Sequence, residues 1–253
     1  MGADALTGWV VPILLLSLRI APVFAFAPPF NLIRTPVLFR MLFGVAAAAC
    51  LASANPEAAA VRSLDGGTLL AAAAAELILG ATFVMVFHLA YGALQVAGRT
   101  VDIQAGFGLS LLIDPSTRAQ TPLVGTLFVY AAAAIFFAMD GHLELVALLA
   151  ASLDAVPVGS HMLPTSLGPL VFFITLVFAL AFGVAGGVIL ALFLTDVTIA
   201  FLSRTVPQMN VLLLGFQVKT LVMLAVLPVT FATSGVLLAR MSRVALEALP
   251  RLM

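Results

Sequence analysis

Six long apolar runs constrain what this chain can fold into more than any other feature of its sequence. A hydrocarbon core about 30 Å thick is spanned by roughly 17–25 residues of helix, and each run is that long or longer. Inside a bilayer only helices and closed barrels satisfy every backbone hydrogen bond, and the alternation typical of barrel strands is missing here. The sequence therefore predicts an all-α integral membrane protein with about six long hydrophobic helices. The runs are Trp9 to Pro28, Val37 to Ala54, Leu69 to Gln95, Pro122 to Met139, Leu167 to Ser203 and Val211 to Leu238.

Polar and turn-forming residues separate the runs. These stretches lie near residues 55–67, 98–121, 140–164 and 205–210. Their prolines, glycines, asparagines and aspartates are typical of connectors. We expect residues 1–253 to form a single membrane-embedded domain whose helices these connectors join.

The composition excludes several classes of function. Hydrophobic residues make up 63% of the 253 positions and charged residues only 9%, which a soluble core could not absorb. Eleven basic residues balance eleven acidic ones, so no net charge attracts nucleic acid. The single cysteine, Cys50, excludes a disulfide framework, an iron–sulfur cluster and a cysteine-based zinc site.

Two of the segments exceed the length of a simple membrane span. Leu167 to Ser203 would measure about 55 Å as a helix, against a hydrocarbon thickness of about 30 Å, so it must tilt, kink or leave the bilayer. Its glycines Gly183, Gly186 and Gly187 offer either a kink or a face for close helix packing, and we favour close packing. The segment that begins at Leu69 also continues beyond its apolar run.

Arginine positions give no consistent membrane orientation. Six spans place the basic tail, which carries Arg240, Arg243 and Arg251, on the opposite side from the arginines of the earlier connectors. We assign no sidedness to individual loops, and the tail is the best candidate for the cytoplasmic side.

Ionisable residues within or near the apolar segments require partners, because an unpaired charge at mid-bilayer costs about 2.5–3.5 kcal/mol even on the insertion scale. Five residues of this kind are Arg19, Glu76, His88, Asp196 and Lys219. A polar stripe at helical spacing consists of His88, Tyr91, Gln95, Arg99 and Asp102. These residues could line a transport or proton pathway, or they could pair between helices or subunits. We favour buried polar contacts between helices or subunits, formed by Arg19, Glu76, His88, Gln95, Arg99, Asp102, Asp196 and Lys219.

The connector from Gly106 to Pro122 is the most distinctive segment, because it is apolar and yet full of helix breakers. An irregular loop at membrane depth is tolerated only inside protein or along a cavity, so this one is a candidate pore constriction or plug. The alternative is an ordinary interfacial turn capped by Asp114. Residue chemistry alone favours neither the plug nor the interfacial turn.

Patterns typical of catalysis are incomplete in this sequence. Gly108-Leu109-Ser110-Leu111-Leu112 begins like a nucleophile elbow but lacks its closing glycine, and no His-Glu-x-x-His motif occurs. Asp140 and Glu144 could share a helix face, but we favour an exposed amphipathic segment there. We expect no enzymatic activity, no cofactor and no metal site.

Short motifs are distributed over nearly the whole chain. They are Arg19-Ile20-Ala21-Pro22 with Ala27-Pro28-Pro29-Phe30, Gly106-Phe107-Gly108-Leu109-Ser110 with Asp114-Pro115 and Ala119-Gln120-Thr121-Pro122, Asp140-Gly141-His142, and Pro207-Gln208-Met209-Asn210-Val211. By their order and spacing these motifs resemble those of the FliR family of flagellar export-gate proteins, which is related to the T-type subunit of virulence-associated type III secretion. Two positions depart from the family's pattern: Asn31 replaces an expected glycine, and Gln217 stands where proline is common.

The resemblance implies tilted helical hairpins that assemble helically with FliP-type and FliQ-type subunits, next to an FlhB-type export switch protein. The expected assembly is a gated conduit for unfolded flagellar proteins, in the bacterial inner membrane at the flagellar basal body. It also implies that the connector plugs the closed channel, with Phe107, Leu109, Leu111, Leu112 and Ile113 as the occluding residues. The whole implied plug loop includes Gly106, Phe107, Gly108, Leu109, Leu111, Leu112, Ile113, Asp114, Pro115 and Gln120.

Three other interpretations compete with a flagellar gate. The equivalent subunit of a virulence secretion system would carry the same kind of motifs. A secondary transporter would need repeated halves with broken helices, and no convincing repeat is present. An intramembrane hydrolase would need a buried nucleophile–base or aspartate pair, and none occurs at a recognisable spacing.

Overall fold

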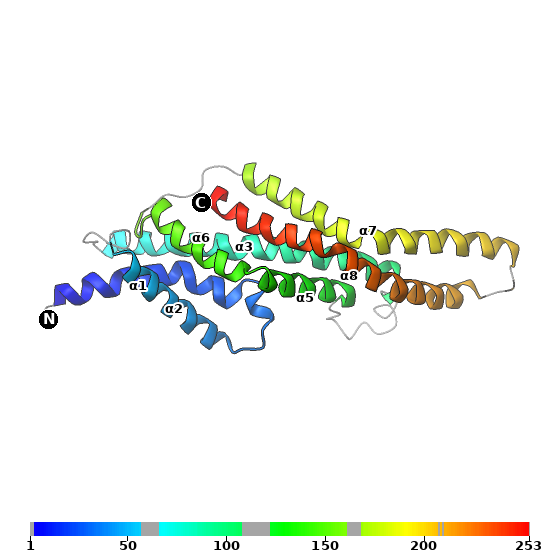
Figure 1. The fold of residues 1–253 in the computed structure, drawn as a ribbon, viewed down its shortest axis with the longest axis horizontal. Helices are drawn as coiled ribbons and strands as arrows, with labels where there is room; N and C mark the ends of the chain where they lie inside the picture. Colours follow the sequence, from blue (N-terminus) through cyan, green and yellow to red (C-terminus); the bar gives the residue numbers. More distant parts are fainter. Residues whose placement is uncertain are drawn as a thin grey trace. The chain divides into compact units, whose positions relative to one another are not determined.

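The computed structural model describes residues 3–56, 66–107, 122–160, 168–206, 208 and 210–252, and all regular structure in these ranges is helical (Figure 1). The prediction of an all-α protein is therefore confirmed. The elements are α1 (Ala3–Phe26), the 3-10 helix η1 (Phe30–Leu32), α2 (Val37–Ala54), α3 (Gly66–Gln104), α5 (Leu123–Ala138), α6 (Gly141–Ala155), α7 (Gly168–Thr205) and α8 (Val211–Leu252).

Five of the described helices, α1, α2, α3, α7 and α8, are long and apolar enough to cross a membrane. The shorter α5 and α6 pass the same test together, but they meet at a bend of 71°. Counting this bent pair as one broken span gives six, which matches the number of apolar runs in the sequence.

Two prolines and an asparagine form the turn that follows α1. Pro28 and Pro29, joined by a cis peptide bond, follow the end of α1, whereas the helix continues through Pro12 and Pro22. The side-chain amide of Asn31 then donates a hydrogen bond of 2.8 Å to the carbonyl oxygen of Phe26, one of the unpaired carbonyls at the helix end. Asn31 thus closes the turn in place of the glycine expected there.

The bend between α5 and α6 is at Asp140, whose φ of 58° is in the left-handed region. Aspartate is among the few residues that adopt this conformation readily. The sequence predicted a connector over residues 140–164, whereas residues 141–155 form α6. Its buried side chains include Leu145, Leu149 and Leu153, and Glu144 and Asp154 are exposed, so the helix is amphipathic.

Two further boundaries differ from the sequence prediction. Residues 98–104, predicted as connector, are the last two turns of α3, so the whole polar stripe lies on one helix. The basic tail is also helical, because α8 continues to Leu252 and includes Arg240 and Arg243. Gln217 lies within this unbroken helix. The connector predicted near 205–210 matches the break between α7 and α8.

The described chain forms two compact units, and helices α3, α5, α7 and α8 contribute residues to both. Unit 1 comprises Met1–Leu89, Phe136–Ile174 and Arg243–Met253, and unit 2 comprises Ala90–Ile135 and Thr175–Ser242. The expectation of a single domain stays a prediction.

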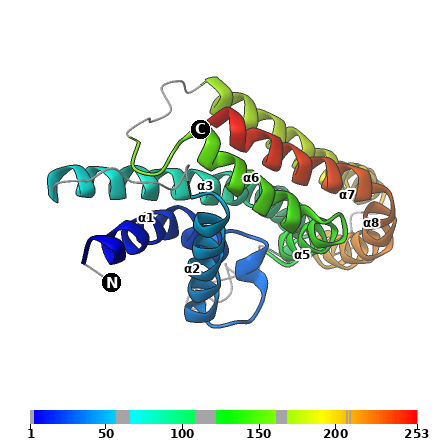
Figure 2. The same cartoon turned by 60° about the vertical axis from the view of Figure 1, so that its left-hand side comes forward.

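Unit 1 brings α1, α2 and the first half of α3 together through glycines. A Cβ atom added at Gly44 of α2 would lie 2.5 Å from the Cα atom of Ala21, and one at Gly80 of α3 would lie 2.6 Å from the carbonyl oxygen of Arg19. Backbones can approach so closely only where no side chain intervenes. Figure 2 shows α2 lying beside α1.

Unit 2 contains the second half of α3 with α5, and the hairpin of α7 and α8. Gly98 of α3 meets Gly125 of α5, where an added Cβ would lie 2.2 Å from the glycine Cα atom. The glycines predicted to pack closely behave differently. An added Cβ would meet only Leu237 Cδ1 at 3.6 Å from Gly183, only Thr230 Oγ1 at 3.7 Å from Gly187, and nothing within 4 Å at Gly186. Within this chain α7 and α8 therefore meet through side chains at this level, and close packing at these glycines stays a prediction.

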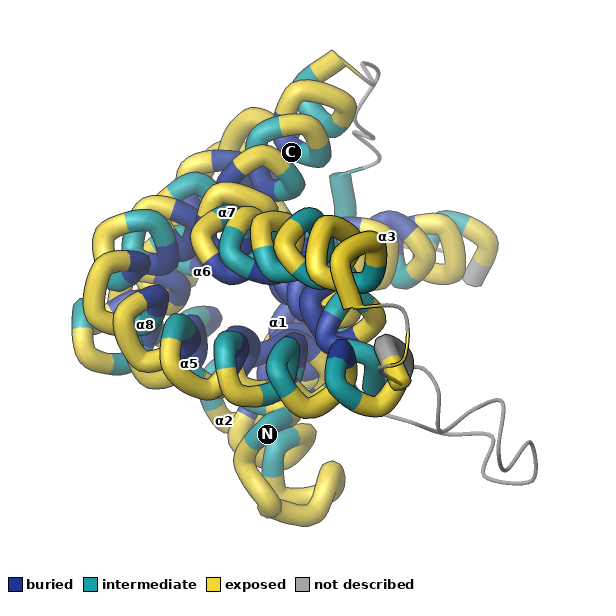
Figure 3. The backbone as a smooth tube through the Cα atoms, turned by 90° about the vertical axis from the view of Figure 1, so that its right-hand side faces the viewer, coloured by how far each residue is buried: buried dark blue, intermediate teal, exposed yellow. Residues whose placement is uncertain are grey.

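Apolar surface remains exposed along α2, α7 and α8 (Figure 3). Only 17% of the span in α2 is buried within this chain. In water such surface would be unfavourable, whereas lipid or neighbouring apolar helices can cover it.

We predict that Gly44→Ala destabilises the purified protein in detergent by about 1–3 kcal/mol, because the new methyl group overlaps the backbone of Ala21. Gly92→Ala is the matched control on α3, where an added Cβ meets nothing within 4 Å. Because alanine favours helix over glycine, this control should be neutral or stabilising. Thermal unfolding midpoints would show the difference, and equal midpoints would contradict the close contact.

Candidate functional site

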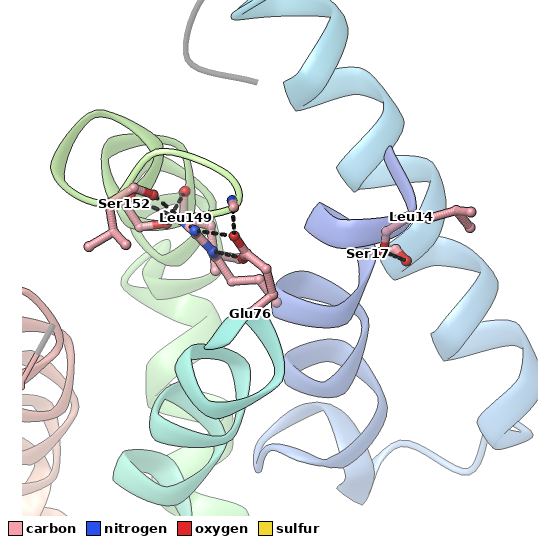
Figure 4. A network of polar contacts seen from close by, with 8 residues as sticks. Leu14, Ser17, Glu76, Leu149 and Ser152 are labelled. Carbon is pink, nitrogen blue, oxygen red and sulfur yellow. Dashed lines mark hydrogen bonds and ion pairs between the residues drawn. The ribbon is translucent and has the colours of Figure 1, made fainter. Parts of the chain in front are cut away.

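In unit 1 the fully buried side chain of Arg19 of α1 reaches Glu76 of α3, which is labelled in Figure 4. Arg19 Nε donates to Glu76 Oε2 at 2.6 Å and Nη2 donates to Oε1 at 2.9 Å, so the pair is bidentate. Both residues have 0% relative exposure. Two parallel bonds between guanidinium and carboxylate are the strongest arrangement that such a pair can adopt.

Arg19 also binds the carboxyl end of α6. Its Nη1 donates to the carbonyl and hydroxyl oxygens of Ser152 at 3.0 and 3.1 Å, and its Nη2 donates to the carbonyl oxygen of Val156 at 2.9 Å. The five N–H groups of a guanidinium therefore have five acceptors here. The positive charge also lies at the negative end of the α6 dipole, which is favourable.

Glu76 accepts one more hydrogen bond, from the backbone N–H of Gly159 at 3.2 Å. Through this contact the turn after α6 is joined to α3. The Arg19–Glu76 network thus connects α1, α3, α6 and the residues just beyond α6 within unit 1.

The second ion pair among the described residues joins the two arms of the α7–α8 hairpin in unit 2. Lys219 Nζ lies 2.5 Å from Asp196 Oδ1, and the side chains are 20% and 44% exposed, respectively. The pair lies near the connecting end of the hairpin, nine residues before α7 ends at Thr205 and eight after α8 begins at Val211. It joins α7 to α8 and leaves part of the carboxylate accessible.

The polar stripe on α3 separates into two kinds of position. His88, Gln95 and Arg99 are exposed in this chain, and the His88 ring nitrogen Nδ1 contacts only its own helix, 3.0 Å from the carbonyl oxygen of Val84. That these three residues contact another subunit stays a prediction. Tyr91 and Asp102 are buried.

Asp102 joins the end of α3 to the start of α5, the two helices on either side of the connector. Its carboxylate oxygens accept hydrogen bonds from the backbone N–H of Val124 at 3.2 and 3.3 Å, in the first turn of α5. A carboxylate at a helix N-terminus satisfies an unpaired N–H group and is favoured by the helix dipole. Together with the contact between Gly98 and Gly125, this bond holds the end of α3 against the start of α5. These contacts therefore join the end of α3 to the start of α5 within unit 2.

Two residues of the predicted plug loop are described, Gly106 and Phe107. Gly106 has a φ of 94°, which favours glycine, and Phe107 packs edge-on against Phe216 of α8 with ring centroids 6.3 Å apart. The remaining predicted plug residues lie outside the described residues; they are Gly108, Leu109, Leu111, Leu112, Ile113, Asp114, Pro115 and Gln120.

Sequence analysis did not identify several partners in these contacts. Ser152, Val156 and Gly159 act through backbone groups or a small hydroxyl, and no residue pattern marks such a role. Gly98 and Gly125 are 27 positions apart in the chain, and only the fold shows that they meet. Within the described ranges, no group of three or more His, Cys, Asp and Glu side chains is placed to hold a metal ion.

Comparison with known proteins assigns this arrangement to a family. The family described as "Bacterial export proteins, family 1" matches residues 10–244, which is most of the chain. The chain belongs to this family. It is therefore a membrane-embedded export protein.

Relatives of this export protein come from flagellar and virulence systems. It is 27% identical to the flagellar biosynthetic protein FliR of Bacillus subtilis over 245 residues, which cover 95% of this chain and 93% of the relative. It is 30% identical over 160 residues to the Yop proteins translocation protein T of Yersinia pestis, covering 62% of this chain and 61% of the relative. The protein SpaR of Shigella flexneri is 25% identical over 221 residues, 85% of this chain and 83% of the relative.

We predict that Arg19→Met destabilises the export protein by about 3–5 kcal/mol, because it leaves the Glu76 carboxylate buried without its charged partner. Arg99→Met is the matched control, since Arg99 is exposed and its loss should change stability by no more than about 0.5 kcal/mol. Thermal stability and yield after membrane extraction measure both effects.

The double variant Arg19→Met/Glu76→Met tests whether the unpaired Glu76 carboxylate causes this loss of stability. It removes both charges and should recover part of the lost stability. A double variant less stable than Arg19→Met alone would contradict an origin in the unpaired carboxylate.

Proposed function

We propose that this chain is the FliR-type subunit of a flagellar protein export gate in the bacterial inner membrane. With FliP-type and FliQ-type subunits it would form the conduit through which unfolded flagellar proteins leave the cytoplasm. An FlhB-type switch protein would bind the same assembly. The observation that carries this proposal is the match to FliR of Bacillus subtilis over 95% of the chain.

An injectisome gate is the second candidate, because proteins with virulence-system names match the same chain. We prefer the flagellar assignment because the match to FliR covers a larger share of this chain. The match to the Yersinia protein includes 62% of this chain, and the longer match to SpaR has lower identity than the full-length match to FliR.

A structural rather than catalytic role is consistent with what the described residues can do. The buried side chains of Arg19, Glu76 and Ser152 in unit 1 bind one another, and all five donors of Arg19 are engaged in holding helices. Such groups are not free to exchange protons with a substrate. The energy for export would come from other proteins.

Contacts with other subunits would cover the exposed apolar faces of α2, α7 and α8. In a membrane, helices associate through close packing and polar contacts rather than through the hydrophobic effect. The exposed His88, Gln95 and Arg99 and the half-exposed Asp196 would supply such polar contacts.

The connector that begins at Gly106 would plug the closed conduit. Support comes from its ends, which Asp102 and the two glycines Gly98 and Gly125 hold together. A translocating chain would displace the connector, and its apolar residues would stop ion leakage at rest.

The proposal of a gate subunit is tested by native mass spectrometry of this chain, tagged and co-expressed with FliP-type and FliQ-type partners from a flagellar system. We expect a stable mixed complex. Co-expression with the equivalent subunits of a virulence system is the comparison. A lone chain or homo-oligomer, with well-expressed flagellar partners, would contradict the proposal, and a complex only with virulence partners would assign the chain to an injectisome.

The plug is tested by replacing residues 107–113 with a Gly/Ser linker of equal length. We expect higher ion conductance of the reconstituted complex with unchanged subunit stoichiometry, because the apolar obstruction is lost while Asp102 still joins α3 to α5. An equal-length Gly/Ser replacement in the connector between α2 and α3 is the control. Unchanged conductance of the 107–113 variant would exclude the plug.

A further inference from the structure

Two arginines of unit 1, Arg34 and Arg40, carry positive charge where α2 begins. Arg34 is in the turn that leads into the helix, and Arg40 is in the first turn of the helix itself. The two ion pairs among the described residues involve neither of these arginines. The sequence also contains no aspartate or glutamate from residue 5 to residue 56. The charge at this end of α2 is therefore not neutralised within the described part of the chain.

The guanidinium group of Arg40 is not simply solvated. The residue is half-buried, and its Nε and Nη1 atoms are buried without a hydrogen-bond acceptor among the described residues. Arg40 is one turn before Gly44 and shares the face of α2 that packs against α1. Buried donors without an acceptor are unfavourable, and charged donors more so. A small outward turn of this long side chain would bring both donors to an acceptor at the surface.

An apolar surface of membrane-spanning length adjoins the two arginines. Helix α2 has 18 residues, and at 1.5 Å per residue its length is about 27 Å, close to the thickness of a hydrocarbon core. Only 17% of this span is buried within the chain. The arginines therefore lie at the end of an apolar segment, where lipid headgroups would be. The exposed apolar side chains nearest to them are Val37, Leu38, Phe39, Leu42 and Phe43.

The chemistry of this end of α2 favours phosphate. A guanidinium group can donate two parallel hydrogen bonds to a phosphate, and the phosphate oxygens can accept bonds from two such groups. The amino end of a helix carries a partial positive charge, which disfavours two arginines there but favours an anion between them. A molecule that satisfies both the charged end and the apolar face combines a phosphate with hydrocarbon chains.

We propose that Arg34 and Arg40 bind the phosphate of an anionic phospholipid whose acyl chains lie along the exposed face of α2. A zwitterionic lipid has the same phosphate but also a cationic group, which the arginines repel, so the site prefers lipids with net negative charge. This inference goes beyond the proposed export function and does not depend on it. It assigns a lipid ligand to the least buried of the membrane-spanning helices.

Native mass spectrometry of the purified full-length chain tests the preference. The chain should bind phosphatidylglycerol more tightly than phosphatidylcholine with the same acyl chains. Each arginine that is removed should weaken phosphatidylglycerol binding about fivefold, the usual contribution of one basic residue near anionic lipid. Arg34→Gln/Arg40→Gln should therefore lose the preference, whereas Arg34→Lys/Arg40→Lys should keep part of it.

A second double variant is the matched control for charge. Arg99→Gln/Arg204→Gln removes two exposed arginines from α3 and α7 and should keep the preference for phosphatidylglycerol. Equal losses in the two glutamine variants would mean that net charge alone attracts the lipid, and the proposed site would be wrong. Thermal unfolding midpoints without added lipid check that both variants are folded.

Photolabelling of the unmodified chain locates the site without any substitution. A phosphatidylglycerol that carries a diazirine on its acyl chain should form adducts within residues 37–45 of α2. A phosphatidylcholine with the same acyl chain should label these residues much less. Equal labelling by the two lipids, or phosphatidylglycerol adducts mainly on other helices, would overturn the proposal.

Two other occupants of the arginine pair would be recognised by the same assays. Inorganic phosphate at the concentration of the lipid should not reduce the labelling of α2; competition would assign the arginines to a free anion. Labelling should also persist in the complex co-expressed with FliP-type and FliQ-type subunits, and its loss there would assign the arginines to a protein contact. Either result would overturn the lipid site and leave the proposed export function intact.

Discussion

The bidentate pair between Arg19 and Glu76 is the interaction on which unit 1 depends. An isolated charge in an apolar environment is strongly unfavourable, so each partner can be buried only while the other is in place. The guanidinium uses its remaining donors on the carboxyl end of α6. Because these bonds are directional, they define how α1, α3 and α6 meet, which apolar contacts alone would leave less specific.

Close backbone contacts at glycines are the second kind of contact that holds the helices together. Gly44 and Gly80 in unit 1, and Gly98 with Gly125 in unit 2, bring helices together where no side chain separates them. Lipid tails are as apolar as leucine, so helices in a membrane gain little from merely burying apolar side chains. Tight contacts and polar bonds hold each unit, while the apolar surface of α2, α7 and α8 stays available to lipid and to other subunits.

Both kinds of contact occur where α3 ends and α5 begins. The carboxylate of Asp102 accepts hydrogen bonds from the backbone N–H of Val124, and Gly98 lies against Gly125. Just beyond the end of α3, Phe107 packs edge-on against Phe216 of α8. A polar bond, a close backbone contact and an aromatic pair therefore position the helices of unit 2 at this end of α3.

Residue patterns predicted some of these features and missed others for identifiable reasons. The apolar runs marked the spans, because hydrophobic length is a local property. Polarity suggested connectors at 98–104 and 140–164, but Asp102 is polar because it binds the start of α5, and α6 is amphipathic because it packs on one face. The glycines of α7 were expected to pack closely, whereas those that do so within this chain lie on α2, α3 and α5, because only the partner helix decides whether a glycine is approached.

The sequence by itself determined the helical class, the membrane location, the breaks at Pro28-Pro29 and before Val211, and the family to which the motifs belong. These depend on local hydrophobicity, on backbone chemistry and on motif order, all of which can be read along the chain. Only the tertiary structure decided that Arg19 pairs with Glu76, that Asp102 binds α5 and that Phe216 meets Phe107. The residues in each of these contacts are separated by at least 22 positions, and their pairing depends on how the helices pack, which no local pattern records.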